Sequence, residues 1–245
     1  MGNYVCSDIH GLGNRYSKLL NKYGRTDKIY IIGDAIDNRY PGEQGINILL
    51  DIMERNNVEL LMGNHELMLI ESLGYFFTLI KNGYTNSQAY DLCLKDEYIK
   101  NWTSNNNGLK TFNDFLKLPK EKQIKLYNFL VRLPISKQLK ILNHSFYLVH
   151  AAPVKVKLKS GEKILYEYNG ETLLANDILK ISRVALHDAV WTRYDEKNIH
   201  ELTIPKTHVI IGHTPTIDGK IKYYGKDELI DIDCDSRNAY QYREK

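Results

Sequence analysis

The stretch Ile31-Ile32-Gly33-Asp34-Ala35-Ile36-Asp37-Asn38-Arg39 combines the end of an apolar run with two closely spaced carboxylates. The run from Lys28 to Ile32 is short and rich in β-branched residues, which predicts a buried strand that ends at Gly33. Charged side chains directly after a buried strand cost free energy unless they are paired or bind a cation. Asp34 and Asp37 therefore mark this strand end as a candidate metal site.

Four other apolar runs also end on side chains that can bind a metal. In open α/β sheets, sites form in the crevice beyond the carboxyl ends of the strands, so we expect these loops to converge. The runs are Asn3–Cys6 before Ser7-Asp8-Ile9-His10-Gly11, Val58–Met62 before Gly63-Asn64-His65-Glu66, Ser145–Val149 before His150, and His208–Ile211 before Gly212-His213-Thr214-Pro215.

The first third of the chain alternates predicted strands and helices, which is typical of βαβ units. Apolar residues at helical spacing predict helices at 16–23 and 46–53, and Asn64 is expected to cap a third helix at 67–71. From about residue 74 to 134 the strand signals vanish. We interpret this part as a helical insertion that serves as lid and packing within a single α/β domain, 1–245. Its predicted helices are 75–80, 87–94, 109–116 and 120–133.

Strands return after the insertion. Alternating apolar and polar residues at 154–166 surround Ser160-Gly161 and predict a hairpin, whose lysines we expect on a solvated strand face. The remaining predicted elements are strands at 139–142 and 146–149, a helix at 173–181, and strands at 220–224 and 228–232.

The composition limits the classes of partner. The 245 residues include 33 basic and 30 acidic ones, and the formal charge of +3 is too balanced to indicate nucleic acid or a membrane surface. No apolar stretch reaches the ~20 residues of a membrane span, and no signal-like segment is evident, so we expect a cytoplasmic protein. Cys6, Cys93 and Cys234 lack a Cys-x-x-Cys spacing, which predicts neither a disulfide framework nor a zinc knuckle. The sequence does not determine the oligomeric state.

The candidate ligands mix carboxylate, amide and imidazole groups. This mixture suits manganese, iron or zinc better than a metal selected by thiolates. Two neighbouring ions need a bridging carboxylate, and Asp34, in the most central loop, is the expected bridge. Four other histidines, His144, His187, His200 and His208, are expected to be structural. The candidate ligand set comprises Asp8, His10, Asp34, Asn64, His150 and His213.

Taken in order, the five motifs resemble those of metallophosphoesterases. They are most similar to the small bacterial and phage branch of the phosphoprotein (serine/threonine) phosphatases, and the resemblance spans residues 3–233. It implies a four-layer α/β fold in which two mixed β-sheets are sandwiched between helices. The matching motifs are Ser7–Gly11, Gly33–Asp37, Gly63–Glu66, Val149-His150 and Gly212–Thr214.

The resemblance also implies a binuclear centre, with manganese as the expected metal and iron or zinc as alternatives. A hydroxide that bridges the two ions would attack phosphorus in line. His65 would protonate the leaving oxygen, and Asp37 would orient the His65 imidazole. Carried over by motif position, the ligands would be Asp8, His10 and Asp34 for one ion, and Asp34, Asn64, His150 and His213 for the other.

Phosphate binding requires cationic groups, for which arginine is well suited. Trp191-Thr192-Arg193 resembles the Trp-x-Arg element of bacterial members, so Arg193 is the first candidate. The chain departs from the family pattern at Asn38, where an arginine is usual, and Arg39 follows one residue later. Either Asn38 or Arg39 would serve as a second phosphate ligand. A further departure is Met62, where phosphoprotein phosphatases often carry arginine.

Three functions compete at this point. The first is a metal-dependent phosphomonoesterase acting on phosphoserine or phosphothreonine in proteins. The second keeps the mechanism but takes a dinucleoside polyphosphate, such as diadenosine tetraphosphate, or another small phosphorylated metabolite. The third is a non-catalytic phosphate-binding scaffold, which is disfavoured because the metal ligands and the His65–Asp37 pair are retained. The balanced charge argues against a nuclease.

Overall fold

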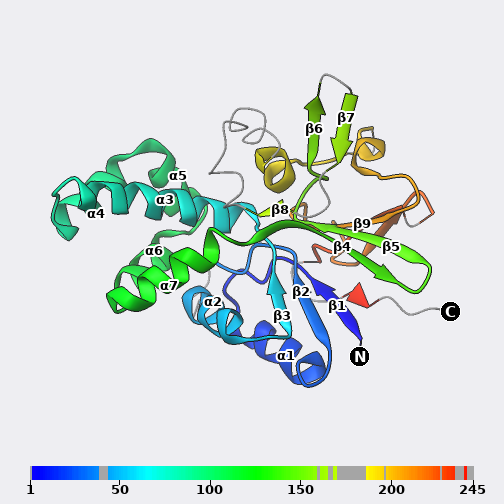
Figure 1. Cartoon of the computed structure of the whole chain (residues 1–245), viewed down its shortest axis with the longest axis horizontal. Helices are drawn as coiled ribbons and strands as arrows, with labels where there is room; N and C mark the ends of the chain where they lie inside the picture. The colour runs from blue at the N-terminus through cyan, green and yellow to red at the C-terminus, as the bar shows by residue number, and fades with distance from the viewer. Residues whose placement is uncertain are drawn as a thin grey trace.

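Two mixed β-sheets form the centre of the molecule, and helices pack outside them (Figure 1). The computed structural model describes residues 2–38, 44–158, 161–164, 168–169, 186–195, 197–226, 228–234 and 240–241. A four-stranded sheet has the order β12-β1-β2-β3, and a six-stranded sheet has the order β10-β11-β9-β5-β4-β8. This arrangement confirms the predicted α/β fold.

Strands β1, β2 and β3 pair in parallel, with helices α1 and α2 as the connections between them, which confirms the predicted βαβ units. In the larger sheet, β5, β9 and β11 are parallel, whereas β4 and β5 form an antiparallel pair. The strands are β1 (Asn3–Cys6), β2 (Lys28–Ile31), β3 (Val58–Leu60), β4 (Pro134–Ile141), β5 (His144–Val149), β8 (Tyr168–Asn169), β9 (His208–Ile211), β10 (Lys222–Tyr224), β11 (Leu229–Asp231) and β12 (Tyr240–Gln241).

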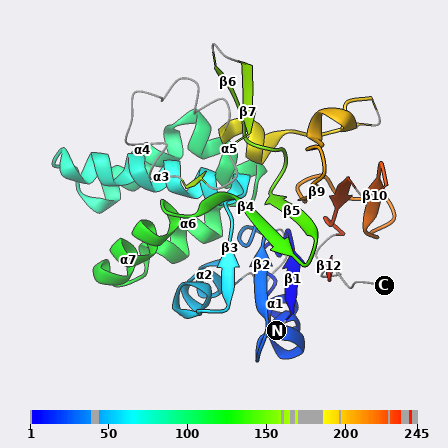
Figure 2. The same ribbon diagram turned by 45° about the vertical axis from the view of Figure 1, so that its right-hand side comes forward.

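The predicted hairpin is also present. Strands β6 (Lys155–Leu158) and β7 (Gly161–Ile164) pair in antiparallel fashion and project from one end of the molecule (Figure 2). The predicted helix at 173–181 lies outside the described residues.

Both faces of the central strands are buried, and this explains why their sequences are continuous apolar runs rather than alternating ones. Ile29 and Ile31 of β2 pack with the helices, whereas Tyr30 and Ile32, the residue after this strand, face the second sheet. Side chains from the two sheets meet in one apolar layer. This layer comprises Val5, Tyr30, Ile32, Leu61, Phe146, Leu148, Ile210, Ile230 and Ile232.

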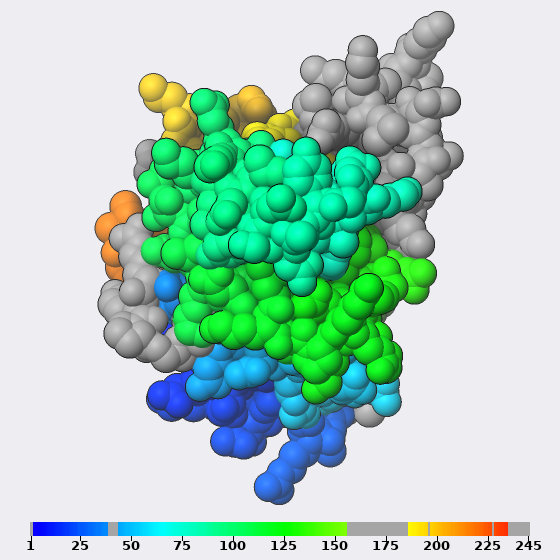
Figure 3. All heavy atoms as spheres, turned by 90° about the vertical axis from the view of Figure 1, so that its left-hand side faces the viewer, coloured from blue at the N-terminus to red at the C-terminus, as the bar shows by residue number. Residues whose placement is uncertain are grey.

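Helices α3 to α7 gather on one side of the sheets, and their cyan-to-green residues occupy much of the face shown in Figure 3. Helix α2, which connects β2 and β3, contacts α6 and α7 of this group. The helices are α1 (Gly13–Tyr23), α2 (Gly45–Glu54), α3 (Asn64–Lys81), α4 (Asn86–Lys95), α5 (Glu97–Asn105), α6 (Leu109–Leu116) and α7 (Lys120–Leu130), with a 3-10 turn η1 (Ile199–Leu202) and a further helical segment at 186–191.

Two helix predictions were wrong. Helix α3 runs without a break through Gly74, where the sequence predicted two segments. A side chain at Gly74 would press on the Tyr127 hydroxyl, so the glycine allows α7 to approach rather than ending α3. Helix α5 was missed, although Asp96 provides a start signal: its carboxylate accepts hydrogen bonds from the backbone N–H groups of Tyr98 and Ile99. No helix among the described residues has both the length and the apolar character needed to cross a bilayer.

The apolar layer between the sheets predicts a large stability effect at Ile210, which is almost fully buried. We expect Ile210→Ala to lower the free energy of unfolding by about 2–5 kcal/mol, because it removes buried methyl groups and leaves a cavity. Urea denaturation followed by circular dichroism measures the loss. The matched control is Ile217→Ala at a fully exposed side chain, for which we expect a change within about 0.5 kcal/mol. Equal losses at both positions would contradict the two-sheet core.

Candidate metal centre

The loops that follow five strands meet at one place. Backbone hydrogen bonds join them: Asp8 N–H donates to Gly33 O at 3.2 Å, and His10 N–H donates to Asp34 O at 2.8 Å. Gly212 N–H donates to His150 O at 2.8 Å in the second sheet. Since the loops leave the strands at the same end, polar side chains that are distant in sequence become neighbours, as predicted.

Several of these side chains stand on strained backbone. Non-glycine residues rarely adopt a positive φ, and such strain concentrates at functional sites. Nine non-glycine residues do so within the described part of the chain, and five of them are candidate site residues. These are Asp8 (φ 53°), His10 (47°), Asp34 (56°), Asp37 (67°) and His213 (66°).

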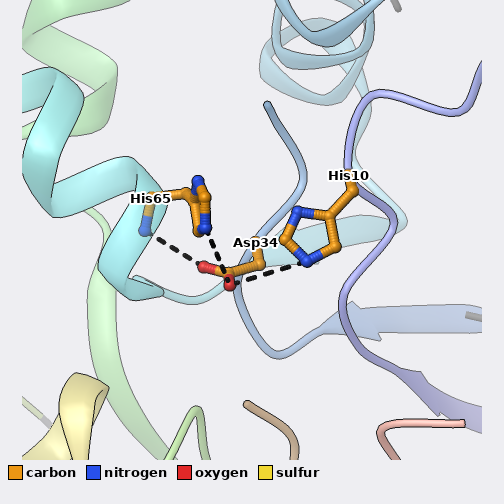
Figure 4. A group of neighbouring side chains, drawn as sticks. All are labelled: His10, Asp34 and His65. Carbon is orange, nitrogen blue, oxygen red and sulfur yellow. Dashed lines mark hydrogen bonds and ion pairs between the residues drawn. The ribbon is translucent and has the colours of Figure 1, made fainter. Parts of the chain in front are cut away.

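The Asp34 carboxylate lies at the middle of the cluster. Its Oδ2 is 3.9 Å from His10 Nε2, 3.8 Å from His65 Nε2 and 3.4 Å from His150 Nε2. Figure 4 shows His10 and His65 pointing at Asp34 from opposite sides. The pKa of Asp34 lies well below its usual value, because the nearby His150 and His65 outweigh the effect of burial, which alone would raise it.

Two groups of side chains around Asp34 have the spacing to hold a metal ion. His10, Asp34 and His65 form one group, and Asp34, His150 and His213 form the other. Asp34 belongs to both, which supports its expected role as the bridge. In the first group the structure places His65, which was predicted as an acid, beside the predicted ligands.

The remaining predicted ligands adjoin these groups. Asp8 Oδ1 is 3.8 Å from His10 Nε2, and Asp8 Oδ2 accepts a hydrogen bond from His213 N–H at 3.2 Å. Asn64 Oδ1 is 3.0 Å from His150 Nε2. The structure therefore brings all six predicted ligands together.

The histidine side chains are oriented in the way that metal ligands require. His150 Nδ1 contacts Ile32 O at 2.8 Å, which leaves Nε2 facing Asp34. His10 Nδ1 contacts the backbone oxygens of Ile36 and Asp37, at 3.2 and 3.1 Å, and leaves its Nε2 facing the carboxylates.

His213 provides the clearest sign that the cluster fits a cation. Its Nε2 is buried and has no hydrogen-bond partner among the described residues. Burial, the neighbouring His150 and Arg193 lower its pKa to about 3, so the imidazole is neutral and can offer a lone pair. Imidazole nitrogens, carboxylates and one amide oxygen form a donor set that suits borderline divalent ions.

Glycines in the motifs make room for this cluster. A side chain at Gly33 would collide with the His150 ring, and one at Gly63 would overlap the Asp34 carboxylate. Gly33 also has a φ of +94°, which favours glycine. The motif glycines are therefore required by the closeness of the ligand loops.

Glu66 is a site residue that the sequence analysis missed. Its carboxylate accepts backbone N–H bonds from Asp34 and Ala35, both at 2.8 Å, and from Gly63 at 2.9 Å. Burial raises the Glu66 pKa to about 7. Glu66 thereby satisfies the backbone N–H of Gly63 at the start of α3. The N-cap residue of this helix is Gly63, so the prediction that Asn64 caps it was wrong. The available signal was Glu66 three residues after Gly63, because a glutamate at this position of a helix can accept a hydrogen bond from the N-cap backbone N–H.

His65 and Asp37 form a close pair beside the ligand cluster. His65 Nδ1 is 2.7 Å from Asp37 Oδ2, and both side chains are largely buried. Burial alone would lower the pKa of His65, but Asp34 and Asp37 outweigh it and raise the pKa to about 9. Trp102 and Thr111 also donate hydrogen bonds to Asp37, which the sequence analysis did not foresee.

The predicted phosphate ligands differ in their positions. Arg193 reaches the cluster, where its Nη1 donates to His213 O at 3.3 Å. Asn38 Nδ2 donates to His10 O at 2.6 Å, so this amide supports the backbone of a ligand loop. Arg39 lies outside the described residues. Met62 is buried and uncharged, so this position provides no cation for phosphate.

Comparison with known proteins identifies the family. A family model described as calcineurin-like phosphoesterase matches residues 4–240. This match confirms the family that the ordered motifs indicated.

The solved structures that match the chain share little sequence with it. A metallophosphoesterase from Sphaerobacter thermophilus has 15% identity and a TM-score of 0.46, and the match covers 94% of this chain and 75% of that one. A serine/threonine phosphatase from Saccharomyces cerevisiae, described as similar to human phosphatase PP5, has 14% identity and a TM-score of 0.46. This match covers 94% of this chain and 66% of that one. A candidate diadenosine tetraphosphatase has 16% identity, a TM-score of 0.47, and coverage of 96% and 84%.

The geometry around Asp34 predicts that metal binding depends on this side chain. A cation that binds only the folded protein at 100 times its Kd stabilises it by about 2.7 kcal/mol, so Mn²⁺ should raise the melting temperature of the wild type. Asp34→Asn should abolish this rise and reduce the bound metal measured by plasma mass spectrometry. Asp218→Asn, at an exposed carboxylate paired with Lys222, is the matched control. This variant should keep both the rise in melting temperature and the metal content of the wild type. Unchanged metal content in Asp34→Asn would contradict the assignment.

Proposed function

Because the chain belongs to the calcineurin-like phosphoesterase family, we propose that it is a metal-dependent phosphomonoesterase that acts on phosphoserine and phosphothreonine in proteins. One observation carries this proposal: the Asp34 carboxylate joins two potential ligand groups, and the His65–Asp37 pair lies directly beside it. This combination suits a phosphatase, because the metal ions would neutralise the phosphate charge while the acid pair delivers a proton to the leaving oxygen.

The proposed centre holds two divalent ions, which we propose to be manganese, with iron or zinc as alternatives that the donor set also suits. Divalent ions at such a centre activate water and neutralise charge on the phosphoryl group. The proposed ligands are Asp8, His10 and Asp34 on one side, and Asp34, Asn64, His150 and His213 on the other.

The protein's own groups would orient the phosphate ester and supply the proton. Arg193 is the proposed phosphate ligand, because its guanidinium lies next to His213 and can bind phosphoryl oxygens. His65 is the proposed general acid. Its Nδ1 is occupied by Asp37 at 2.7 Å, so the Nε2 atom is the one that would donate to the leaving oxygen.

A second candidate is hydrolysis of a dinucleoside polyphosphate or another small phosphorylated metabolite. It is favoured by residues 38 and 62, where phosphoprotein phosphatases commonly carry arginine. Here Asn38 bonds to the backbone of His10, and Met62 is buried and uncharged. The proposed substrate is not nucleic acid, because the net charge of +3 provides little excess of basic groups.

Side-by-side kinetics on two substrates test the proposed substrate class. We expect the manganese-loaded wild type to hydrolyse a phosphothreonine peptide with kcat/KM at least about tenfold higher than for diadenosine tetraphosphate, a preference of about 1.4 kcal/mol. EDTA treatment and Asp34→Asn should each abolish phosphate release from both. A preference for the dinucleotide would favour the second candidate, and no hydrolysis of either would overturn the catalytic proposal.

The role of His65 can be separated from metal binding, although geometry also places it near a potential ligand group. If His65 is the general acid, His65→Gln should lower kcat for phenyl phosphate by about 100- to 10,000-fold, because the leaving phenolate then departs without a proton. The metal content of the variant should equal that of the wild type. Loss of a metal ion from His65→Gln would instead identify His65 as a ligand.

A further inference from the structure

The helical insertion reaches into the site through two side chains. Trp102 on α5 donates its Nε1–H to Asp37 Oδ2 at 2.6 Å, and Thr111 on α6 donates its hydroxyl to Asp37 Oδ1. The same Oδ2 atom faces His65 Nδ1 at 2.7 Å. Three donors therefore converge on one carboxylate, and both of its oxygens are engaged.

This arrangement is sealed from solvent. The side chain of Asp37 has no exposed surface, and Trp102 and Thr111 are fully buried as well. Burial of a carboxylate is costly unless its oxygens accept hydrogen bonds or pair with a cation. The two insertion donors supply these bonds where water cannot reach.

The packing around Trp102 holds the indole in place. Its ring meets the edge of Phe112 at a centroid distance of 6.0 Å, and it lies directly over Gly108 at the start of α6. Any side chain at residue 108 would overlap the indole. The absence of a side chain at Gly108 thus makes room for the indole in the orientation seen here.

We propose that Trp102 and Thr111 are positioning residues for proton transfer by His65, acting through Asp37. This inference rests on the proposed phosphatase function. A carboxylate bonded through both oxygens cannot rotate about its Cβ–Cγ bond without breaking a hydrogen bond. The imidazole bonded to it is held in one ring orientation, with Nε2 directed at the ligand cluster.

The inference gives the helical insertion a part in the chemistry. From sequence, the insertion was interpreted as lid and packing only. In the structure, α5 supplies Trp102 and α6 supplies Thr111 as hydrogen-bond donors to the Asp37 carboxylate, beside His65. Docking of the insertion and alignment of His65 are therefore coupled.

A comparison of leaving groups tests the proposal. Phenyl phosphate depends on protonation of the departing oxygen, whereas 2,4-dinitrophenyl phosphate releases a stable anion that needs no acid. We expect Thr111→Val and Trp102→Phe each to lower kcat for phenyl phosphate by about 10- to 100-fold, as outer-shell partners commonly do, with KM unchanged. The loss for 2,4-dinitrophenyl phosphate should be less than about threefold, since only the proton-dependent step is affected.

Two further variants serve as controls. Thr111→Ser keeps the hydroxyl and should retain most of the activity on phenyl phosphate. Thr103→Val removes a buried hydroxyl from the same insertion, but this hydroxyl bonds to Ile99 O at 2.9 Å within α5. Thr103→Val should therefore leave the ratio of the two rates unchanged. Equal losses on both esters in Thr111→Val and Trp102→Phe would overturn the positioning role.

Proton NMR of the zinc-loaded protein provides a measurement that needs no turnover, and zinc avoids the broadening that paramagnetic manganese would cause. The His65 Nδ1–H proton, bonded to Asp37, should resonate far downfield and disappear in His65→Gln. Thr111→Val should shift this signal, and Thr103→Val should not. An unshifted signal in Thr111→Val would overturn the inference, whereas absence of wild-type hydrolysis of any phosphate ester would overturn the proposed function instead.

Discussion

The site depends on placing the carboxylates of Asp8 and Asp34 side by side, away from water. Burial of an ionised carboxylate costs several kcal/mol unless positive or polar groups offset the cost. Here Asp34 has three imidazoles within 3.9 Å, and Asp8 accepts bonds from the Ser7 hydroxyl and the His213 backbone. These partners come from loops of both sheets. The fold must therefore bring the strand ends of two sheets together before the charges can be stabilised.

Much of the loop structure serves this constraint. The positive φ values at Asp8, Asp34 and His213 turn these side chains toward the centre of the cluster. An extended backbone would direct them elsewhere. Such conformations cost of order 1–3 kcal/mol each and persist only where surrounding bonds enforce them. Glu66 supplies some of these bonds, because its carboxylate ties the loop after β2 to the start of α3. A residue outside the ligand set thus maintains the geometry of the ligands.

Sequence reasoning predicts the parts of this site that are local. A strand followed by Gly-Asp or Gly-Asn-His is visible in a few residues, so β2 and β3 were predicted to within one or two positions. Contacts between distant segments leave no such pattern. Trp102 and Thr111 lie 65 and 74 residues after Asp37, in a region where apolar spacing indicates helices but not which polar groups face the site. Arg39 lies outside the described residues, so its predicted role stays a prediction.

The two parts of the proposed chemistry have different structural origins. The proposed metal ligands stand at the ends of strands and at the start of α3, and some are oriented by backbone groups, as His150 is by Ile32 O. The proton-transfer pair is oriented by the insertion, through Trp102 and Thr111. Changes in the insertion can therefore alter proton delivery while the metal ligands stay in place.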